Sequence, residues 1–100
     1  MTNTFAVLKE KLPSAIERMP SEFDTHRLIL ELARENQRAY IDVLHESDSE
    51  FPFQTVHASI GRALKQLSLE PDSRIKEKEA KIGSLNIFGV ISACSKWERL

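Results

Sequence analysis

Cysteine, glycine and proline are all scarce in this chain of 100 residues, which contains one, three and four of them respectively. The single Cys94 cannot form a disulfide within the chain, and this favours a cytoplasmic location. The few glycines lie too far apart to build a phosphate-binding loop. No apolar run approaches the roughly 18 residues of a membrane span, and the amino terminus lacks the features of a signal peptide. No membrane association is therefore expected.

Residue patterns typical of catalysis or of metal binding are missing as well. None of His26, His45 and His57 has a second ligand-type residue at metal-binding spacing on an evident shared face. Cys94 has no histidine near it in the sequence and no nucleophile motif around it, so we expect it to behave as a small buried hydrophobic residue. The sequence thus predicts a protein that is not an enzyme, with no catalytic residues, no metal site and no cofactor.

What is present is a globular composition with 41% hydrophobic and 29% charged residues. A chain of this length corresponds to one domain, residues 1–100, with a single modest core. The net charge is −1, but the charges are unevenly distributed. Residues 1–50 hold six Lys/Arg and ten Asp/Glu, giving −4, whereas residues 51–100 hold eight and five, giving +3. The carboxyl-terminal half is therefore the half expected to face an anionic partner.

Apolar residues recur at helical spacing through the first two thirds of the chain. Pro13 removes a backbone donor and predicts a break in the first helical segment. Asp24 is a favoured amino-cap, and Asn36 is placed to cap a further helix, although the helices on either side of Asn36 can also fuse. The expected segments are an amino-terminal helical extension at 1–20 and a helical core at 24–67, with helices at 25–34, 37–45 and 52–67.

The last third of the chain has a different pattern. Residues 74–81 alternate in charge, which predicts a solvated connection or a short exposed helix. Residues 81–100 are richer in glycine and β-branched side chains, which favours two short strands joined by a loop at 86–89. A helix over residues 92–100 is the competing interpretation, so the sequence leaves open whether this segment is strand or helix.

Three helices followed by a two-stranded hairpin is the element order of winged-helix domains, which the chain resembles over residues 24–100. The resemblance lies in the order and length of the elements, and no residue motif of one winged-helix family accompanies it. It implies a mainly α fold, a helical bundle with a carboxyl-terminal β-hairpin in which residues 81–100 form the wing. In such domains the third core helix enters the major groove of DNA, and the wing contacts the backbone or the minor groove.

The segment 52–67 has the two faces that such a helix needs. Its polar face carries no acidic residue, and its side chains are of types that reach phosphates and base edges. Arg62 and Lys65 are expected to contact phosphates, and Lys81 and Lys96 to flank the wing. The residues expected nearest the base edges are Gln54, Thr55 and Ser59. The apolar stripe expected to face the core consists of Phe53, Val56, Ile60, Ala63, Leu64 and Leu67.

The sequence therefore predicts a small DNA-binding domain, either a transcriptional regulator or an accessory factor. The same residues are also compatible with a protein-interaction module that uses this helix face or the hydrophobic hairpin. The apolar residues within 87–91 exceed what a small wing needs, and Trp97 is expected to anchor either the core or a subunit contact. A homodimer is expected on these grounds, formed through this cluster or through the amino-terminal helix, with DNA or another protein as the further partner.

Overall fold

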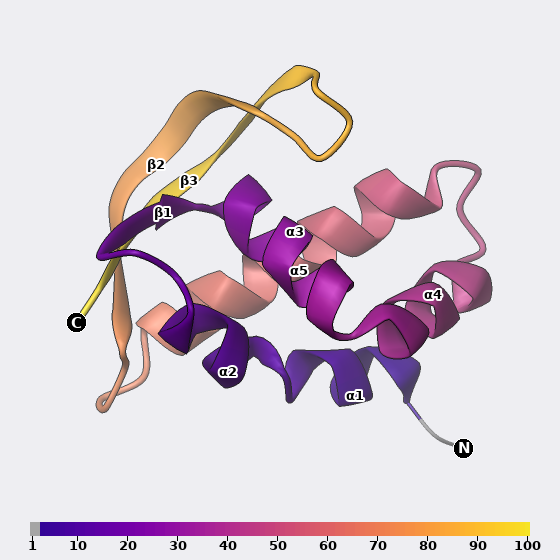
Figure 1. The fold of residues 1–100 in the computed structure, drawn as a ribbon, viewed down its shortest axis with the longest axis horizontal. Helices are drawn as coiled ribbons and strands as arrows, with labels where there is room; N and C mark the ends of the chain where they lie inside the picture. The colour runs from indigo at the N-terminus through magenta and orange to yellow at the C-terminus, as the bar shows by residue number, and fades with distance from the viewer. Residues whose placement is uncertain (1–2) are drawn as a thin grey trace.

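A computed structural model describes residues 3–100, and the part of the predicted amino-terminal helix at residues 1 and 2 lies outside them. The radius of gyration of 12.9 Å is close to the value of about 13 Å for a compact chain of 100 residues. Helices and a small antiparallel sheet share one hydrophobic core (Figure 1). The described elements are α1 (Thr4–Lys9), α2 (Leu12–Glu17), β1 (Glu22–Asp24), α3 (Thr25–Glu35), α4 (Gln37–Glu46), α5 (Pro52–Ser68), β2 (Ile75–Leu85) and β3 (Ile91–Arg99).

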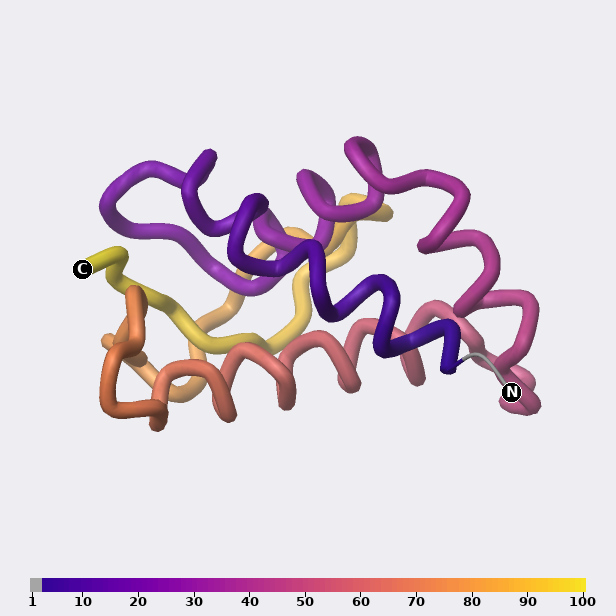
Figure 2. The backbone as a smooth tube through the Cα atoms, turned by 90° about the horizontal axis from the view of Figure 1, so that it is seen from below, coloured from indigo at the N-terminus to yellow at the C-terminus, as the bar shows by residue number. Residues whose placement is uncertain are grey.

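The first 20 residues form two short helices, with Pro13 in the first turn of α2, where its missing N–H costs least. This confirms the predicted break. Leu8, Leu12 and Ile16 from these helices are buried, and α1 packs against α4 while α2 packs against α3. Figure 2 shows both helices lying along the face of the molecule that is viewed from below. The amino-terminal segment is therefore part of the core and does not project from it.

Helices α3 and α4 are separate, which resolves the alternative that the sequence left open. Asp24 caps α3 as predicted, with its Oδ1 accepting a hydrogen bond from the Arg27 N–H at 2.8 Å. Asn36 leaves helical geometry at φ −137° and makes no side-chain cap on α4. Its Nδ2 instead donates to the Leu32 carbonyl at 3.0 Å. Asn36 thus stands at the predicted N-cap position of α4, where its carbonyl accepts from the Tyr40 N–H at 2.9 Å, but its side chain closes the end of α3 instead.

Helix α5 begins at Pro52 and carries its apolar stripe inward. Val56, Ile60 and Leu64 are at most 3% exposed, as the spacing predicts. Phe53 departs from the prediction because its side chain is 40% exposed. It lies at the first turn, beyond the helical core, and packs against the hairpin loop instead. Most of the stripe is thus confirmed, but its amino-terminal end belongs to a different contact.

The sheet has the strand order β1–β3–β2, with both neighbouring pairs antiparallel. Strand β2 begins at Ile75, so most of residues 74–81 belongs to the sheet, and the prediction of a connection or a short helix was wrong. Ile75 is buried and anchors the strand, while the alternating charges lie on a ladder that is mostly exposed. The competing helix at 92–100 was also wrong, because residues 91–99 pair with both β1 and β2.

Trp97 connects the sheet to the helices. It is 1% exposed, and its Nε1–H donates to Thr25 Oγ1 at 2.9 Å. Its Cα pairs with that of Phe23 in β1. This strand has only three residues, which is too short for a recognisable sequence pattern. Trp97 is therefore a core anchor within its own chain. This confirms the first of the two roles predicted for it, the core anchor, and not the subunit contact.

Candidate nucleic-acid interface

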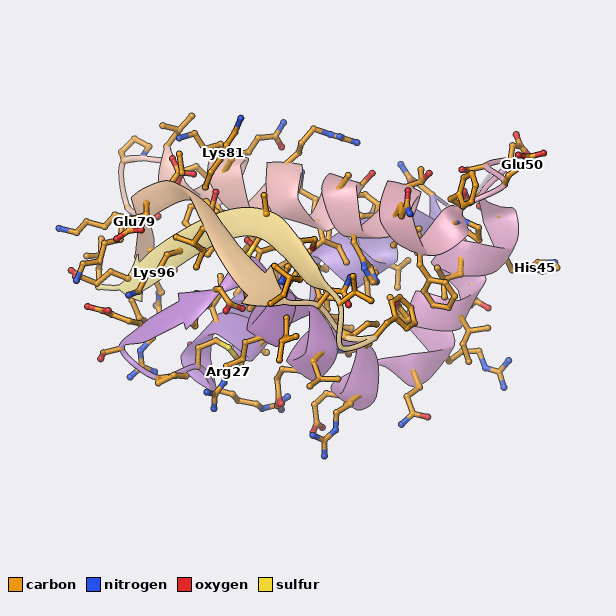
Figure 3. All side chains as sticks on the ribbon, turned by 90° about the horizontal axis from the view of Figure 1, so that it is seen from above. Arg27, His45, Glu50, Glu79, Lys81 and Lys96 are labelled. Atoms are coloured by element: carbon orange, nitrogen blue, oxygen red, sulfur yellow. The ribbon has the colours of Figure 1, made fainter. Side chains whose placement is uncertain are left out.

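A groove of about 530 Å³ lies between α5 and the β2–β3 hairpin, with the first turn of α3 at its base. Figure 3 shows the hairpin crossing between α5 on one side and α3 on the other. The groove is positioned by the core contacts of α5 and by Trp97, which holds β3 against Thr25. The predicted site residues Gln54, Arg62, Lys65 and Lys81 all line it. The fold thus brings part of the helix face and one hairpin lysine together.

The charged lining of the groove is mainly cationic. Arg62, Lys65 and Lys81 face it, and Glu77 is the one acidic side chain among its lining residues. Glu77 comes from β2 and binds Lys65 Nζ at 2.6 Å. Its pKa is lowered by the hydrogen bond from Lys65 and then by the bond from Ser95, so the carboxylate stays ionised. The helix itself carries no acidic residue on this face, but the hairpin supplies one, which the sequence did not reveal.

The polar residues on α5 form a short internal network. Ser59 Oγ donates to the Thr55 carbonyl at 3.1 Å and accepts from Arg62 Nη2 at 3.0 Å. Thr55 and Arg62 are exposed, and Ser59 is half-buried between them. Gln54 is exposed and lies on the groove side of the helix. These four side chains share the solvent-facing surface of α5, as the helical spacing predicted.

Lys96 lies outside the groove. Its Nζ is 3.3 Å from Glu22 Oε1, and the same carboxylate is bound by Lys78 from β2. Figure 3 shows Lys81 beside the carboxyl-terminal half of α5 and Lys96 on the other side of the hairpin. The hydrogen bonds from Lys78 and Lys96 lower the pKa of Glu22. The structure therefore does not bring the two predicted wing lysines together.

Aromatic rings gather at the end of the groove nearest the hairpin loop, a feature that the sequence analysis missed. Phe53 and Phe88 meet edge to face, with centroids 4.9 Å apart and planes at 81°. His57 stacks between Tyr40 and Phe88, with centroids 6.0 Å and 6.3 Å away. The hairpin loop is therefore docked on the first two turns of α5. This contact joins residues distant in sequence, so helical periodicity alone could not indicate it.

His57 is half-buried, and its hydrogen-bond partner is the hydroxyl of Tyr40. The oxygen and His57 Nε2 are 2.6 Å apart. Burial raises the pKa of Tyr40 to about 12, so the hydroxyl keeps its proton. Burial, followed by the nearby charge of His26, lowers the pKa of His57 and favours the neutral ring. A protonated tyrosine then donates to a neutral imidazole, which fixes the His57 ring at the side of the groove.

Cys94 is half-buried and free, in a polar setting that the sequence did not predict. Burial raises the pKa of its thiol, while backbone N–H groups of His26 and Thr25 at the start of α3 act in the opposite direction. The prediction of a small buried hydrophobic residue was therefore wrong, because Cys94 is only half-buried and has polar neighbours. The thiol contacts polar groups because β3 crosses directly over the first turn of α3.

Comparison of the chain with protein-family models, with curated proteins and with solved structures gave no match. Within residues 3–100, none of the helices combines the length and the apolar character needed to cross a bilayer. What the site can do therefore has to be inferred from the groove, the exposed face of α5 and the hairpin.

Proposed function

We propose that this chain is a winged-helix-like domain that binds duplex DNA through α5 and the β2–β3 hairpin. The observation that carries the proposal is the convergence of Arg62, Lys65 and Lys81 on one groove beside an exposed polar helix face. Cationic side chains that line a concave surface concentrate anionic ligands there. A phosphate backbone is the extended anion that such a surface fits best.

The arrangement of the elements supports the same proposal. The hairpin follows the longest helix, and β1 pairs with β3 to give the order β1–β3–β2. The major groove of B-DNA, about 12 Å wide, admits one α-helix. With α5 in that groove, Gln54, Thr55 and Ser59 approach base edges, while Arg62 and Lys65 approach phosphates. Lys81 then contacts the flanking backbone from the hairpin.

The test is a titration of random-sequence duplex by fluorescence anisotropy at several salt concentrations. Replacing both Arg62 and Lys81 with Ala should weaken binding to all sequences and flatten the slope of log K against log salt by about 0.9 per lost phosphate contact. Lys96→Ala removes the same charge outside the groove and is the matched control. If the groove is the interface, this control should change the slope less than either of the single variants Arg62→Ala and Lys81→Ala does.

Base recognition needs a separate measurement. Gln54→Ala should relax the preference at one or two base pairs in a binding-site selection, with each such contact worth roughly 1–3 kcal/mol. Its effect on affinity for random duplex should be small because no charge is lost. A wild-type domain that binds no duplex even at low salt would refute the DNA proposal.

A second candidate function is protein interaction, and the hairpin supplies the observation that favours it. Around the loop between β2 and β3, large apolar side chains are 56–66% exposed. These residues, which we call the hairpin tip, are Leu85, Phe88, Val90 and Ile91. Contiguous exposed apolar surface marks interaction sites. Under this proposal the hairpin tip contacts a second copy of the chain or another protein.

A further inference from the structure

Three residues able to ligate a metal ion meet where β3 crosses the start of α3. A carboxylate oxygen of Asp24, a ring nitrogen of His26 and Sγ of Cys94 all lie within 4.8 Å of one another. Asp24 and His26 flank the first residue of α3, while Cys94 comes from the opposite end of the chain. Only Asp24 and His26 are close in the sequence, so the cluster with Cys94 could not be recognised before the fold was known.

The imidazole of His26 is the part of this cluster that points to a ligand. The residue is 9% exposed, and its Nε2 lies 3.1 Å from Ser92 Oγ. Its Nδ1 is buried and has no hydrogen-bond partner anywhere in the described range 3–100. A buried polar atom without a partner costs free energy and calls for an explanation. When Nε2 donates its proton to Ser92, Nδ1 presents a lone pair.

This arrangement is the one in which histidine usually binds metals. A metal-bound imidazole donates its other ring N–H to a neighbouring acceptor, which sets the tautomer and the ring orientation. Ser92 occupies that position for His26. Ser84 plays a similar part for Asp24, because its hydroxyl donates to Asp24 Oδ2 at 2.7 Å. Two hairpin serines thus orient two of the three prospective ligands.

Asp24 can ligate a metal without giving up its structural role. Its Oδ1 accepts from the Arg27 N–H at 2.8 Å, and its Oδ2 accepts from Ser84. An ionised carboxylate has about four lone-pair positions, so sites for a metal remain. The amino-cap of α3 is therefore compatible with coordination by the same side chain.

We propose that Asp24, His26 and Cys94 form a zinc site with a fourth position left for water or an external ligand. Zinc accepts oxygen, nitrogen and thiolate ligands at bond lengths of about 2.0–2.3 Å in tetrahedral geometry. Such bonds place ligand atoms roughly 3.3–3.8 Å apart, so the three groups need only small side-chain movements. The thiolate and the imidazole disfavour magnesium and calcium, which require oxygen ligands. A carboxylate and a thiolate together balance the charge of the ion.

The site is accessible from the groove. His26 and Cys94 both line the space between α5 and the hairpin, together with Ser92. A metal ion can therefore reach the cluster without opening the core. An open fourth position would face a cavity large enough for a small ligand, which distinguishes this site from closed structural zinc centres.

The experiment is a titration of the purified metal-free chain with Co²⁺, followed by competition with Zn²⁺. We expect one ion per chain, visible bands of tetrahedral cobalt and a near-ultraviolet band from thiolate-to-cobalt charge transfer. Cys94→Ser should abolish the charge-transfer band, and Ser92→Ala should weaken binding about 10- to 100-fold through the loss of an outer-shell partner. His45→Ala removes an exposed histidine outside the cluster and is the matched control.

Circular dichroism of each variant without metal verifies that the fold is retained, and Ser92→Ala provides a test if Cys94→Ser does not fold. The proposal is overturned if the wild-type chain gives no charge-transfer band. It is also overturned if folded Cys94→Ser or Ser92→Ala binds Co²⁺ as tightly as the His45→Ala control. The measurement uses no DNA, so its result is independent of the proposed DNA binding.

Discussion

At the scale of single residues, the pair formed by Tyr40 and His57 links the core to the groove. Tyr40 is 8% exposed, and its hydroxyl lies 2.6 Å from His57 Nε2. Since burial keeps the tyrosine protonated, the bond depends on an imidazole that can accept. Protonation of His57 would remove that acceptor and place a charge among aromatic rings.

This pair predicts a loss of stability in acid. An unfolded histidine titrates near a pKa of about 6.5, whereas burial lowers the pKa of His57 in the folded chain. Between the two pKa values the unfolded state binds a proton that the folded state does not. The free energy of unfolding should therefore fall as the pH is lowered from about 6.5 towards the folded pKa. Urea unfolding across this range measures the effect.

His57→Gln should reduce this pH dependence because the amide does not titrate. Gln54→Ala, on the same helix and without an ionisable group, is the control and should keep the wild-type dependence. If His57→Gln and the wild-type chain lose stability in parallel, His57 is not the group responsible.

At the scale of elements, glycine is required at one position of the hairpin but not at another position in α5. Gly89 lies in the hairpin loop at φ +78°, where an L side chain is strained even though a Cβ there would have open space around it. Gly61 lies inside α5, and a Cβ there would meet Thr25 Cγ2 at 3.9 Å, an ordinary contact. The packing of α5 therefore does not require glycine at position 61.

We expect the two alanine substitutions to change stability in opposite directions. Gly89→Ala should destabilise the fold by roughly 1–2 kcal/mol, the cost of left-handed backbone for an L-residue. Gly61→Ala should stabilise it by about 0.4–1 kcal/mol because the unfolded chain loses freedom. Thermal and denaturant unfolding measure both. A destabilised Gly61→Ala would mean that α5 and α3 pack more tightly than the 3.9 Å contact indicates.

At the scale of the whole molecule, apolar surface is concentrated at one end of the sheet. Phe53 and Ile87 connect this region to the helices, but the hairpin tip remains exposed. Trp97 is satisfied within its own chain, so it is not available for the subunit contact that the sequence also allowed. We therefore expect a twofold dimer to form through the hairpin tip, where the exposed apolar side chains are adjacent in the sequence and in the hairpin.

Sedimentation at high micromolar concentration tests this expectation. The wild-type chain should dimerise, and replacing Val90 and Ile91 with Ser should shift it towards monomer without unfolding it. Leu69→Ser alters an apolar side chain that is 73% exposed and lies outside the hairpin tip, so it should leave the dimer intact. If the wild-type chain sediments as a monomer, the dimer is excluded, and the hairpin tip would have to contact a different protein under the second candidate function.

Elements with local signals could be predicted from the sequence. Asp24 as an amino-cap, Pro52 at the start of α5 and the buried stripe of Val56, Ile60 and Leu64 follow from backbone chemistry and helical periodicity. These features need no knowledge of distant residues, because each depends on neighbours within about one or two helical turns.

How distant segments meet could be seen only in the folded chain. Residues 75–81 became strand because β3 offered a partner ladder, although their charges suggested a solvated connection. The packing of this hairpin on the helices placed Glu77 against Lys65 of α5 and brought Cys94 to His26 of α3, while Lys96 lies apart from Lys81. Strand register and the packing of the hairpin on α3 and α5, and not local propensity, fix these contacts, since each joins residues far apart in the sequence.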